Sequence, residues 1–242
     1  MKTELEAPVP VRIFPPIFPV PQSQVRREDG VSLAIQGSFS PSRRTYAGTL
    51  RQMATMMSSE RQESQRKAYL GTGERRATLK EPILLHLVGF GERPAVPEAL
   101  QNNVFFHTNL MFPAFYRVLS QSFAILPAFA TSGYFRNIAS STIPASLIVA
   151  TPLVTNESTL ASYTYLPREA AWMMEEGETE LDTVARVMDD WEGYLLRRDK
   201  IKEMAARLMD ENAVNMGEWM AEAKIKMRHI RQRKAESLAN EP

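Results

Sequence analysis

Residues 201–230 read IKEMAARLMDENAVNMGEWMAEAKIKMRHI. Apolar side chains recur along this stretch at steps of three and four residues, with one gap at Asn212, which is the spacing of one face of an α-helix. A helix continued from Asp199 to Ser237 would be roughly 58 Å long at about 1.5 Å per residue. A body of ordinary size, with a radius of gyration of about 14 Å, cannot cover so long a stripe. The sequence therefore predicts a helical arm, part of which meets another chain.

The residues before this stretch continue the arm in a second register. Residues 181–195, LDTVARVMDDWEGYL, place Leu181, Val184 and Met188 on one helical face together with Trp191 and Leu195. Because this stripe and the next one are out of register, we expect a stutter, a bend or a short break near Arg198. Residues 169–196 carry nine acids and one base, and residues 197–242 carry eleven bases and eight acids. The predicted C-terminal arm, residues 167–242, is therefore acidic first and basic afterwards.

The N-terminal residues 1–30 predict a different kind of arm. Residues 8–21, PVPVRIFPPIFPVP, are rich in proline, which fixes φ and removes a backbone donor, so neither a helix nor a central strand fits. We expect an extended or polyproline segment. Phe14, Ile17 and Phe18 are candidate anchors in a groove of a neighbouring subunit. The alternatives are an arm that packs on the chain's own body or stays mobile, and recognition by an SH3 or WW domain.

Residues 31–166 between the two arms predict a mixed body. Alternation of apolar and polar residues predicts a strand at 31–37, helical spacing predicts a helix at 45–70, and an apolar run predicts a buried strand at 83–90. A buried helix is expected over residues 109–126, with Pro113 in its first turn and Pro127 at its end. The apolar runs 146–150 and 162–166 predict two further strands, joined as a hairpin through turn residues at 156–158. The predicted fold class is therefore α+β.

Composition excludes several classes of protein. A hydrophobic content of 44% is enough for a core, and a net charge of +1 gives no overall attraction to nucleic acid or membrane. The absence of cysteine excludes disulfides and thiolate chemistry. The first residues fit neither a secretory signal nor a transit peptide, and no run of about 18 apolar residues occurs. We expect no membrane partner, and a location inside the cell, in the cytoplasm, or in a virion.

No signature of catalysis is present in the sequence. The nucleophile elbow, the zinc-protease motif, the phosphate loop and the dinucleotide fingerprint are all absent. The three histidines, His86, His107 and His229, lack the spacing of a metal site or a catalytic triad. The sequence therefore predicts no enzyme, with no catalytic, cofactor-binding or metal-binding residues and no small-molecule substrate.

These observations predict a structural subunit of a multi-copy assembly, such as a virion, a phage-like particle or a similar machine, in which both arms contact neighbouring subunits or copies of the same chain. The candidate contact residues are the apolar ones of the two arms: Phe14, Ile17, Phe18, Ile201, Met204, Leu208, Met216, Met220, Met227 and Ile230. The alternative is a nucleocapsid-like protein that binds nucleic acid. Its candidate phosphate contacts are the basic residues Arg26, Arg27, Arg43, Arg44, Lys224, Lys226, Arg228, Arg231, Arg233 and Lys234.

Overall fold

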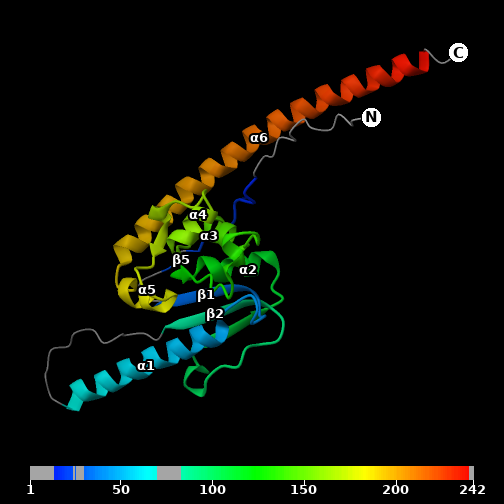
Figure 1. Cartoon of the computed structure of the whole chain (residues 1–242). Helices are drawn as coiled ribbons and strands as arrows, with labels where there is room; N and C mark the ends of the chain where they lie inside the picture. The colour runs from blue at the N-terminus through cyan, green and yellow to red at the C-terminus, as the bar shows by residue number, and fades with distance from the viewer. Residues whose placement is uncertain (1–13, 24, 26–29, 70–82, 240–242) are drawn as a thin grey trace.

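A six-stranded parallel sheet forms the centre of the protein in a computed structural model that describes residues 14–23, 25, 30–69 and 83–239. The strands lie in the order β3-β2-β1-β4-β5-β6, and each described pair of neighbours is parallel. Figure 1 shows α1 on one side of the strands, and α2, α3 and α4 on the other. Helices on both faces of a parallel sheet define an α/β fold, so the predicted α+β class is wrong.

The strands shorten towards the second half of the chain. Their bounds are β1 Ser32–Ser38, β2 Leu84–Phe90, β3 Val104–Thr108, β4 Ala124–Ile125, β5 Leu153–Thr155 and β6 Ala171–Met173. The predicted strands at 31–37 and 83–90 are confirmed by β1 and β2. The strand β6 lies in residues that the sequence analysis assigned to the C-terminal arm.

The helices vary in length from one or two turns to a long rod. Their bounds are α1 Tyr46–Tyr69, α2 Phe112–Ser120, α3 Thr142–Val149, α4 Glu157–Ser162, α5 Glu180–Val187 and α6 Trp191–Ala239, with short 3₁₀ turns at Glu98–Leu100, Ser132–Phe135 and Arg168–Ala170. The predicted helix at 45–70 is confirmed by α1. The predicted buried helix at 109–126 is only partly right: Pro113 does stand in the first turn of α2, but this helix ends at Ser120 and only its last two residues are buried. Residues 124–125 form the strand β4 instead.

The predicted hairpin is wrong in both of its strands. Residues 146–150 belong to α3 and its C-cap, and residues 162–166 form the end of α4 and a turn. Every residue of α3 is buried, so this helix has no polar face that would show a helical period in the sequence. The turn residue Asn156 instead caps α4, because its side chain accepts a hydrogen bond from the backbone N–H of Thr159 at 3.0 Å.

Alternating residues of the strands divide the core between the two faces of the sheet. Leu33 and Ile35 of β1 face the cluster that includes side chains of α1 and α5, whereas Ala34 faces the cluster that includes side chains of α2 and α3. Ile17 of the N-terminal segment is buried in this second cluster. The N-terminal segment therefore packs on the chain's own body at this point.

The long helix α6 is continuous through residue 198, so the predicted break there is wrong. Tyr194, Arg198 and Ile201 are all buried on one face of the helix. The Arg198 guanidinium donates to Tyr194 Oη at 2.7 Å and to the Ser23 carbonyl at 3.1 Å. This buried face of α6 therefore includes a charged residue, and it contacts both the body and the N-terminal segment.

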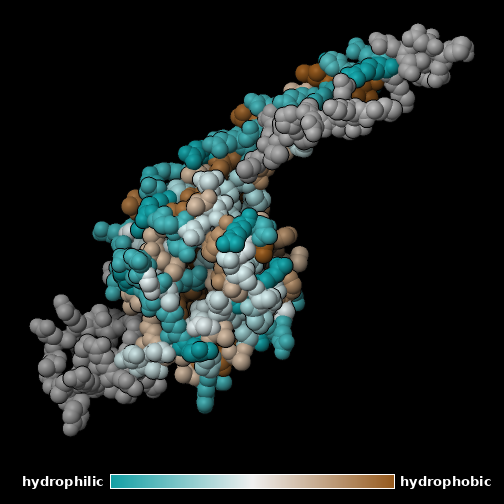
Figure 2. Space-filling view, in the orientation of Figure 1, coloured by the Kyte–Doolittle hydropathy of each residue, from teal (hydrophilic) through white to brown (hydrophobic). Residues whose placement is uncertain are grey.

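Beyond the body, α6 projects outwards with apolar side chains on its surface. Figure 1 shows the second half of the helix leaving the body, and Figure 2 shows hydrophobic residues along it. The exposed apolar residues there include Met216, Trp219, Met220, Met227 and Ile230. In the described part of the chain, no helix combines the length and the apolar character that crossing a bilayer requires.

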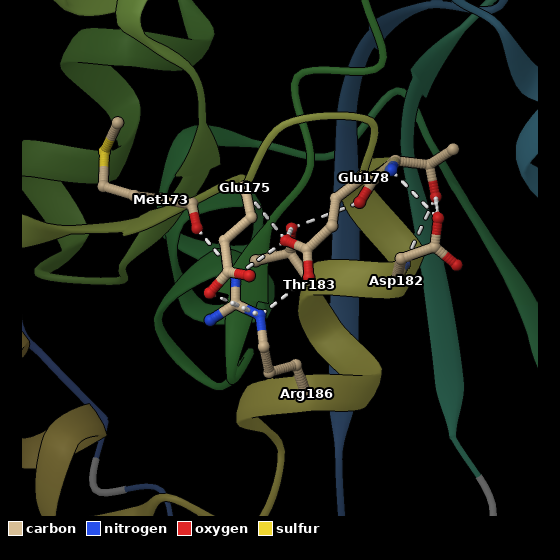
Figure 3. Close-up of polar contacts among 7 residues, drawn as sticks. Met173, Glu175, Glu178, Asp182, Thr183 and Arg186 are labelled. Carbon is tan, nitrogen blue, oxygen red and sulfur yellow. Dashed lines mark hydrogen bonds and ion pairs between the residues drawn. The ribbon is translucent and has the colours of Figure 1, made fainter.

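The turn between β6 and α5 is fixed by the carboxylate of Glu178, as Figure 3 shows. Arg186 donates to both carboxylate oxygens at 2.7 Å. The backbone N–H of Glu175 and the Thr183 hydroxyl donate to Oε2 at 2.9 and 2.8 Å. These bonds, that of Arg186 first, lower the pKa of Glu178 to about 2 because they stabilise the charged form. The network fixes the start of α5 and with it the position of Glu180.

Candidate functional site

The carboxyl ends of β1 and β4 mark the point where the direction of the sheet's connectivity reverses. From β1 the chain builds outwards through β2 to β3, and it then returns to β4 and builds outwards through β5 to β6. In open α/β sheets, ligands bind in the crevice outside the carboxyl ends of the strands at such a switch point. The loops that follow β1 and β4 are therefore the first place to look for a site.

A buried arginine stands in the loop after β1. Arg44 is 5% exposed, and its guanidinium donates to the carbonyls of Gln36 and Arg43, each at 3.2 Å, and to Thr142 Oγ1 at 3.1 Å. These acceptors are neutral, and no carboxylate among the described residues forms an ion pair with Arg44. A buried cation without a partner anion is costly, so an anionic ligand would be stabilised here.

The surroundings of Arg44 are shaped to hold its guanidinium. The group lies over the rings of Phe129 and Tyr134, at 5.2 Å from each centroid. Gly37 has φ +132°, and a Cβ added to it would lie 3.1 Å from Arg44 Nη2. Gly37 therefore provides both the backbone conformation and the space that this arginine needs.

Ala128, after β4, joins three elements at the same edge. Its φ of 47° lies in the left-handed region, which is uncommon for a residue other than glycine. Its N–H donates to Glu180 Oε1 at 2.8 Å, and its carbonyl accepts from the N–H of Thr45 at 2.8 Å. These two bonds connect the end of β4 to the starts of α5 and α1. Strained conformations of this kind cluster at functional sites.

A cavity of about 290 Å³ opens beside these residues. It is lined by Thr45, Pro127, Ala128, Phe129, Phe135, Val154, Thr155, Asn156, Thr159, Met174 and Glu180. Phe129 forms a wall of the cavity and also packs against the Arg44 guanidinium, so the cation and the cavity are neighbours. Small-molecule sites have this composition, apolar walls with a few converging polar groups.

Glu180 is the acidic group of this cavity. Burial raises the pKa of its carboxyl to about 7, although the Ala128 N–H and the positive charge of Arg44 act in the opposite direction. At neutral pH this group is therefore divided between its protonated and its charged form. Perturbed carboxyls in a cavity are typical of binding and catalytic sites.

Replacement of Glu180 with glutamine is expected to stabilise the protein at pH 8 and not at pH 4.5. The folded pKa lies above the ordinary 4.5, so the wild type loses stability as pH rises from about 4.5 through about 7. Glutamine keeps an acceptor for Ala128 N–H and avoids this loss, which we place at about 1–2 kcal/mol after allowance for solvent screening. Urea unfolding at both pH values measures the difference. Glu192→Gln, on the exposed side of α6, is the control, and an equal gain in the control would contradict the role of Glu180.

The basic residues predicted to contact phosphates are widely separated. Arg43 is exposed and Arg44 buried at the carboxyl edge. Arg26 and Arg27 lie outside the described residues. The remaining ones belong to the outer part of α6, where those with a described side chain are exposed: Lys224, Lys226, Arg228, Arg231 and Arg233, with Lys234 beyond them. Their contact with nucleic acid stays a prediction.

The predicted subunit contacts divide into two groups. Ile17, Ile201 and Leu208 are buried in this chain's own core, and Met204 packs against that core. Phe14 lies 6.2 Å from the Trp219 ring, and Phe18 lies 5.5 Å from that of Tyr116. Met216, Met220, Met227 and Ile230 are exposed on α6, and their contact with another subunit stays a prediction.

Two of the histidines are closer than their separation in sequence suggests. His86 Nδ1 and His107 Nε2 are 2.9 Å apart across β2 and β3, and burial lowers the pKa of His86 to about 4. They lie away from the switch point, on strands of the other half of the sheet. Within the described ranges, no group of three or more histidine and acidic residues is placed to hold a metal ion.

Two polar residues that line the cavity, Thr155 and Glu180, were not among the predicted site residues. Thr155 ends a strand of three residues, too short to leave a pattern. In the sequence Glu180 is one of nine acids in the acidic part of the predicted arm, residues 169–196, but it also stands at the first position of α5, directly after the capping residue Thr179. That cap was the available signal that Glu180 begins a helix.

Comparison with known proteins identifies the fold. No protein-family model and no curated protein matches the sequence. The structure is similar to sucrose-phosphate synthase from Thermosynechococcus elongatus, with a TM-score of 0.51 and 13% identity, over 82% of this chain and 46% of the synthase. It is also similar to HepE from Anabaena in complex with UDP-glucose, with a TM-score of 0.51 and 12% identity, over 81% of this chain and 50% of HepE. The chain thus spans about half the length of these proteins.

This likeness contradicts the predicted function. A virion-like structural subunit that is no enzyme and takes no small-molecule substrate was expected. The sheet is instead a Rossmann-like one whose order reverses between β1 and β4, and in sheets of this kind the carboxyl edge at the reversal is the usual place for a ligand. The chain shares the fold of an enzyme, sucrose-phosphate synthase, and of a protein solved with a nucleotide sugar, HepE.

Proposed function

We propose that this chain is a nucleotide-sugar-binding domain of a glycosyltransferase, and that the carboxyl edge around Arg44 is its site. The observation that carries the proposal is the buried guanidinium of Arg44, which has no ion-pair partner among the described residues and stands at the switch point of the sheet. HepE, similar in fold, is known in complex with UDP and with UDP-glucose. The predicted intracellular location is part of this proposal.

The diphosphate would lie against Arg44. The guanidinium has five N–H donors, of which three are engaged by Gln36, Arg43 and Thr142. The two others can donate to phosphate oxygens, for which the planar guanidinium is well suited.

Helix geometry supports an anion at the same place. Thr142 is the first residue of α3, and Tyr46, two residues after Arg44, is the first residue of α1. The positive end of the helix dipole favours phosphate at both N-termini, although the N–H of Thr142 already donates to Ser140 Oγ at 3.2 Å. The Arg44 guanidinium and the N-termini of α1 and α3 therefore lie close together at the carboxyl edge of the sheet.

The same groups would assist the reaction. When a sugar leaves a nucleoside diphosphate, the negative charge on the departing diphosphate increases. A positive group that is already fixed in a site of low water content stabilises this charge without reorganisation. Arg44, held by three hydrogen bonds and two aromatic rings, is such a group.

Isothermal titration calorimetry with UDP-glucose, UDP and uridine tests the proposal. We expect UDP-glucose and UDP to bind with dissociation constants below about 1 mM. Uridine, which lacks the diphosphate, should bind at least tenfold more weakly than UDP. Absence of binding by UDP and UDP-glucose, or equal binding of uridine and UDP, would contradict the proposal.

A further inference from the structure

The outer half of α6 carries a regular apolar seam along residues 209–230. Its members follow one another at alternating steps of four and three residues, which is the heptad spacing of helices that pack along their length. They are Met209, Ala213, Met216, Met220, Ala223, Met227 and Ile230. The outer ones are exposed, by 53% at Met220 and 58% at Ile230, and Figure 2 shows hydrophobic side chains along this projecting part of the helix.

The N-terminal segment contacts α6 on one flank of the seam and leaves the seam itself exposed. Asn212 Nδ2 donates to the Pro15 carbonyl at 2.8 Å, and the rings of Phe14 and Trp219 lie 6.2 Å apart. Asn212 and Trp219 each stand one position before a member of the seam, so both belong to the same flank. The seam is therefore available to another occupant.

A glycine at the middle of the seam indicates a close neighbour. Gly217 follows Met216 inside α6, and a Cβ added to it would meet nothing within 4 Å in this chain. Glycine lowers the stability of a helix interior relative to alanine, and here it relieves no contact within the chain. Glycine also allows another backbone to approach closely, which a second helix on the seam would use.

The charges along α6 favour a second copy of the chain, in the opposite direction. Residues 224–233 contain five basic residues and no acid, whereas residues 203–211 contain three acids and one base. Two copies that ran parallel would place their basic ends side by side, which is unfavourable. In an antiparallel pair the basic end of each copy lies along the acidic stretch of the other.

We infer that two copies of this chain pair antiparallel through the outer half of α6, with Met216 of each packed against the partner's Met220. In this register Ala213 lies opposite the partner's Ala223, so large residues meet large ones and small residues meet small ones. The seam is about 32 Å long at about 1.5 Å per residue. The two-fold symmetry of such a pair makes every contact twice.

The same register explains the residues beside the seam. Lys224 lies next to the partner's Asp210, and Gly217 lies next to the partner's Gly217, where the two backbones come closest. The pairing uses the far end of α6 and not the carboxyl edge of the sheet (Figure 1), so it is independent of the proposed nucleotide site.

Sedimentation equilibrium of the full chain tests the pairing. We expect the wild type to form a dimer with a dissociation constant below about 10 µM. Met220→Glu should weaken the dimer at least 30-fold, because the two-fold symmetry buries two carboxylates without partners at its centre. Ile225→Glu is the matched control: Ile225 is also 53% exposed, but it lies about 140° away around the helix, and we expect less than a threefold effect.

Disulfide formation tests the direction of the two helices. The chain has no cysteine, so the double variant Asp210→Cys/Lys224→Cys carries only the two introduced thiols. They are roughly 21 Å apart along one helix, too far to bridge within a chain. After mild oxidation, peptide mapping should find position 210 of one copy linked to position 224 of the other. Links of each position to itself would mean a parallel pair and would overturn the inference.

A monomeric wild type at 100 µM would also overturn the inference, even if that monomer bound anionic vesicles or nucleic acid. Equal weakening by Met220→Glu and Ile225→Glu would do the same, because the seam would then have no special part. Circular dichroism checks that both variants keep their helix. None of these results bears on the binding of UDP, which is measured separately.

Discussion

Arg44→Met is expected to weaken the binding of UDP-glucose and of UDP about 100-fold, which corresponds to roughly 2.7 kcal/mol. The variant removes the charge and the two free N–H donors that we assign to the diphosphate. It leaves no unpaired carboxylate behind, because no described carboxylate forms an ion pair with Arg44, so the fold should survive the change. Calorimetry gives the affinities, and circular dichroism confirms the fold.

Arg231→Met is the matched control for this experiment. It removes the same charge from an exposed residue at the outer end of α6, far from the sheet (Figure 1). We expect it to change the affinity less than threefold, since an exposed and distant charge is screened by salt. Equal losses in Arg44→Met and in Arg231→Met would mean that overall charge, and not the carboxyl edge, holds the nucleotide.

Gly89→Ala is expected to destabilise the protein by about 3 kcal/mol or more, the upper range for overpacking in a core. Gly89 of β2 pairs with Gly37 of β1, and a Cβ added to Gly89 would lie 1.7 Å from the Gly37 carbonyl oxygen. That neighbour is backbone, so relief requires that the two strands separate at the carboxyl edge. Gly37 also accommodates Arg44, so UDP binding should weaken together with stability. Urea unfolding gives the free energy.

Gly48→Ala is the control for the loss of a glycine. Gly48 lies in α1, and a Cβ added there would meet nothing within 4 Å. Alanine has the higher helix propensity, so this variant should gain up to about 1 kcal/mol. Similar stabilities of Gly89→Ala and wild type would show that β1 and β2 do not need the close approach between Gly37 and Gly89.

The first half of the fold could be predicted from the sequence because its elements are long. The strands β1 and β2 have seven residues each, and α1 has 24, so alternation and helical spacing are visible. The second half could not be predicted in this way. The strands β4, β5 and β6 have only two or three residues, and α3 is apolar on every face, so its short run resembles a strand.

The C-terminal arm shows how a single charged residue can hide a pattern. Tyr194, Arg198 and Ile201 are buried on one continuous helical face, but the predicted stripes left Tyr194 and Arg198 out and included the exposed Leu195. The two apparent registers follow from these two assignments. Burial of Arg198 depends on the hydroxyl of Tyr194 and the carbonyl of Ser23, contacts that no local pattern encodes.

The site was the least predictable part. Arg43 and Arg44 were recognised as possible phosphate contacts, yet which of them is buried depends on the space at Gly37 and on Phe129 and Tyr134. These aromatic residues lie some 85 to 90 positions away in the chain. The topology of the sheet brings them together, and the topology was not visible in the sequence.

Mapping of UDP on the isotope-labelled protein by ¹H–¹⁵N NMR tests the central claim most directly. We predict that the largest shifts occur at the carboxyl edge, in the amides of Gly37, Ser38, Arg44, Thr45 and Thr142, and that they saturate with a single dissociation constant. Shifts concentrated on residues 224–233 of α6, or no shifts at millimolar UDP, would contradict a nucleotide site at the switch point of the sheet.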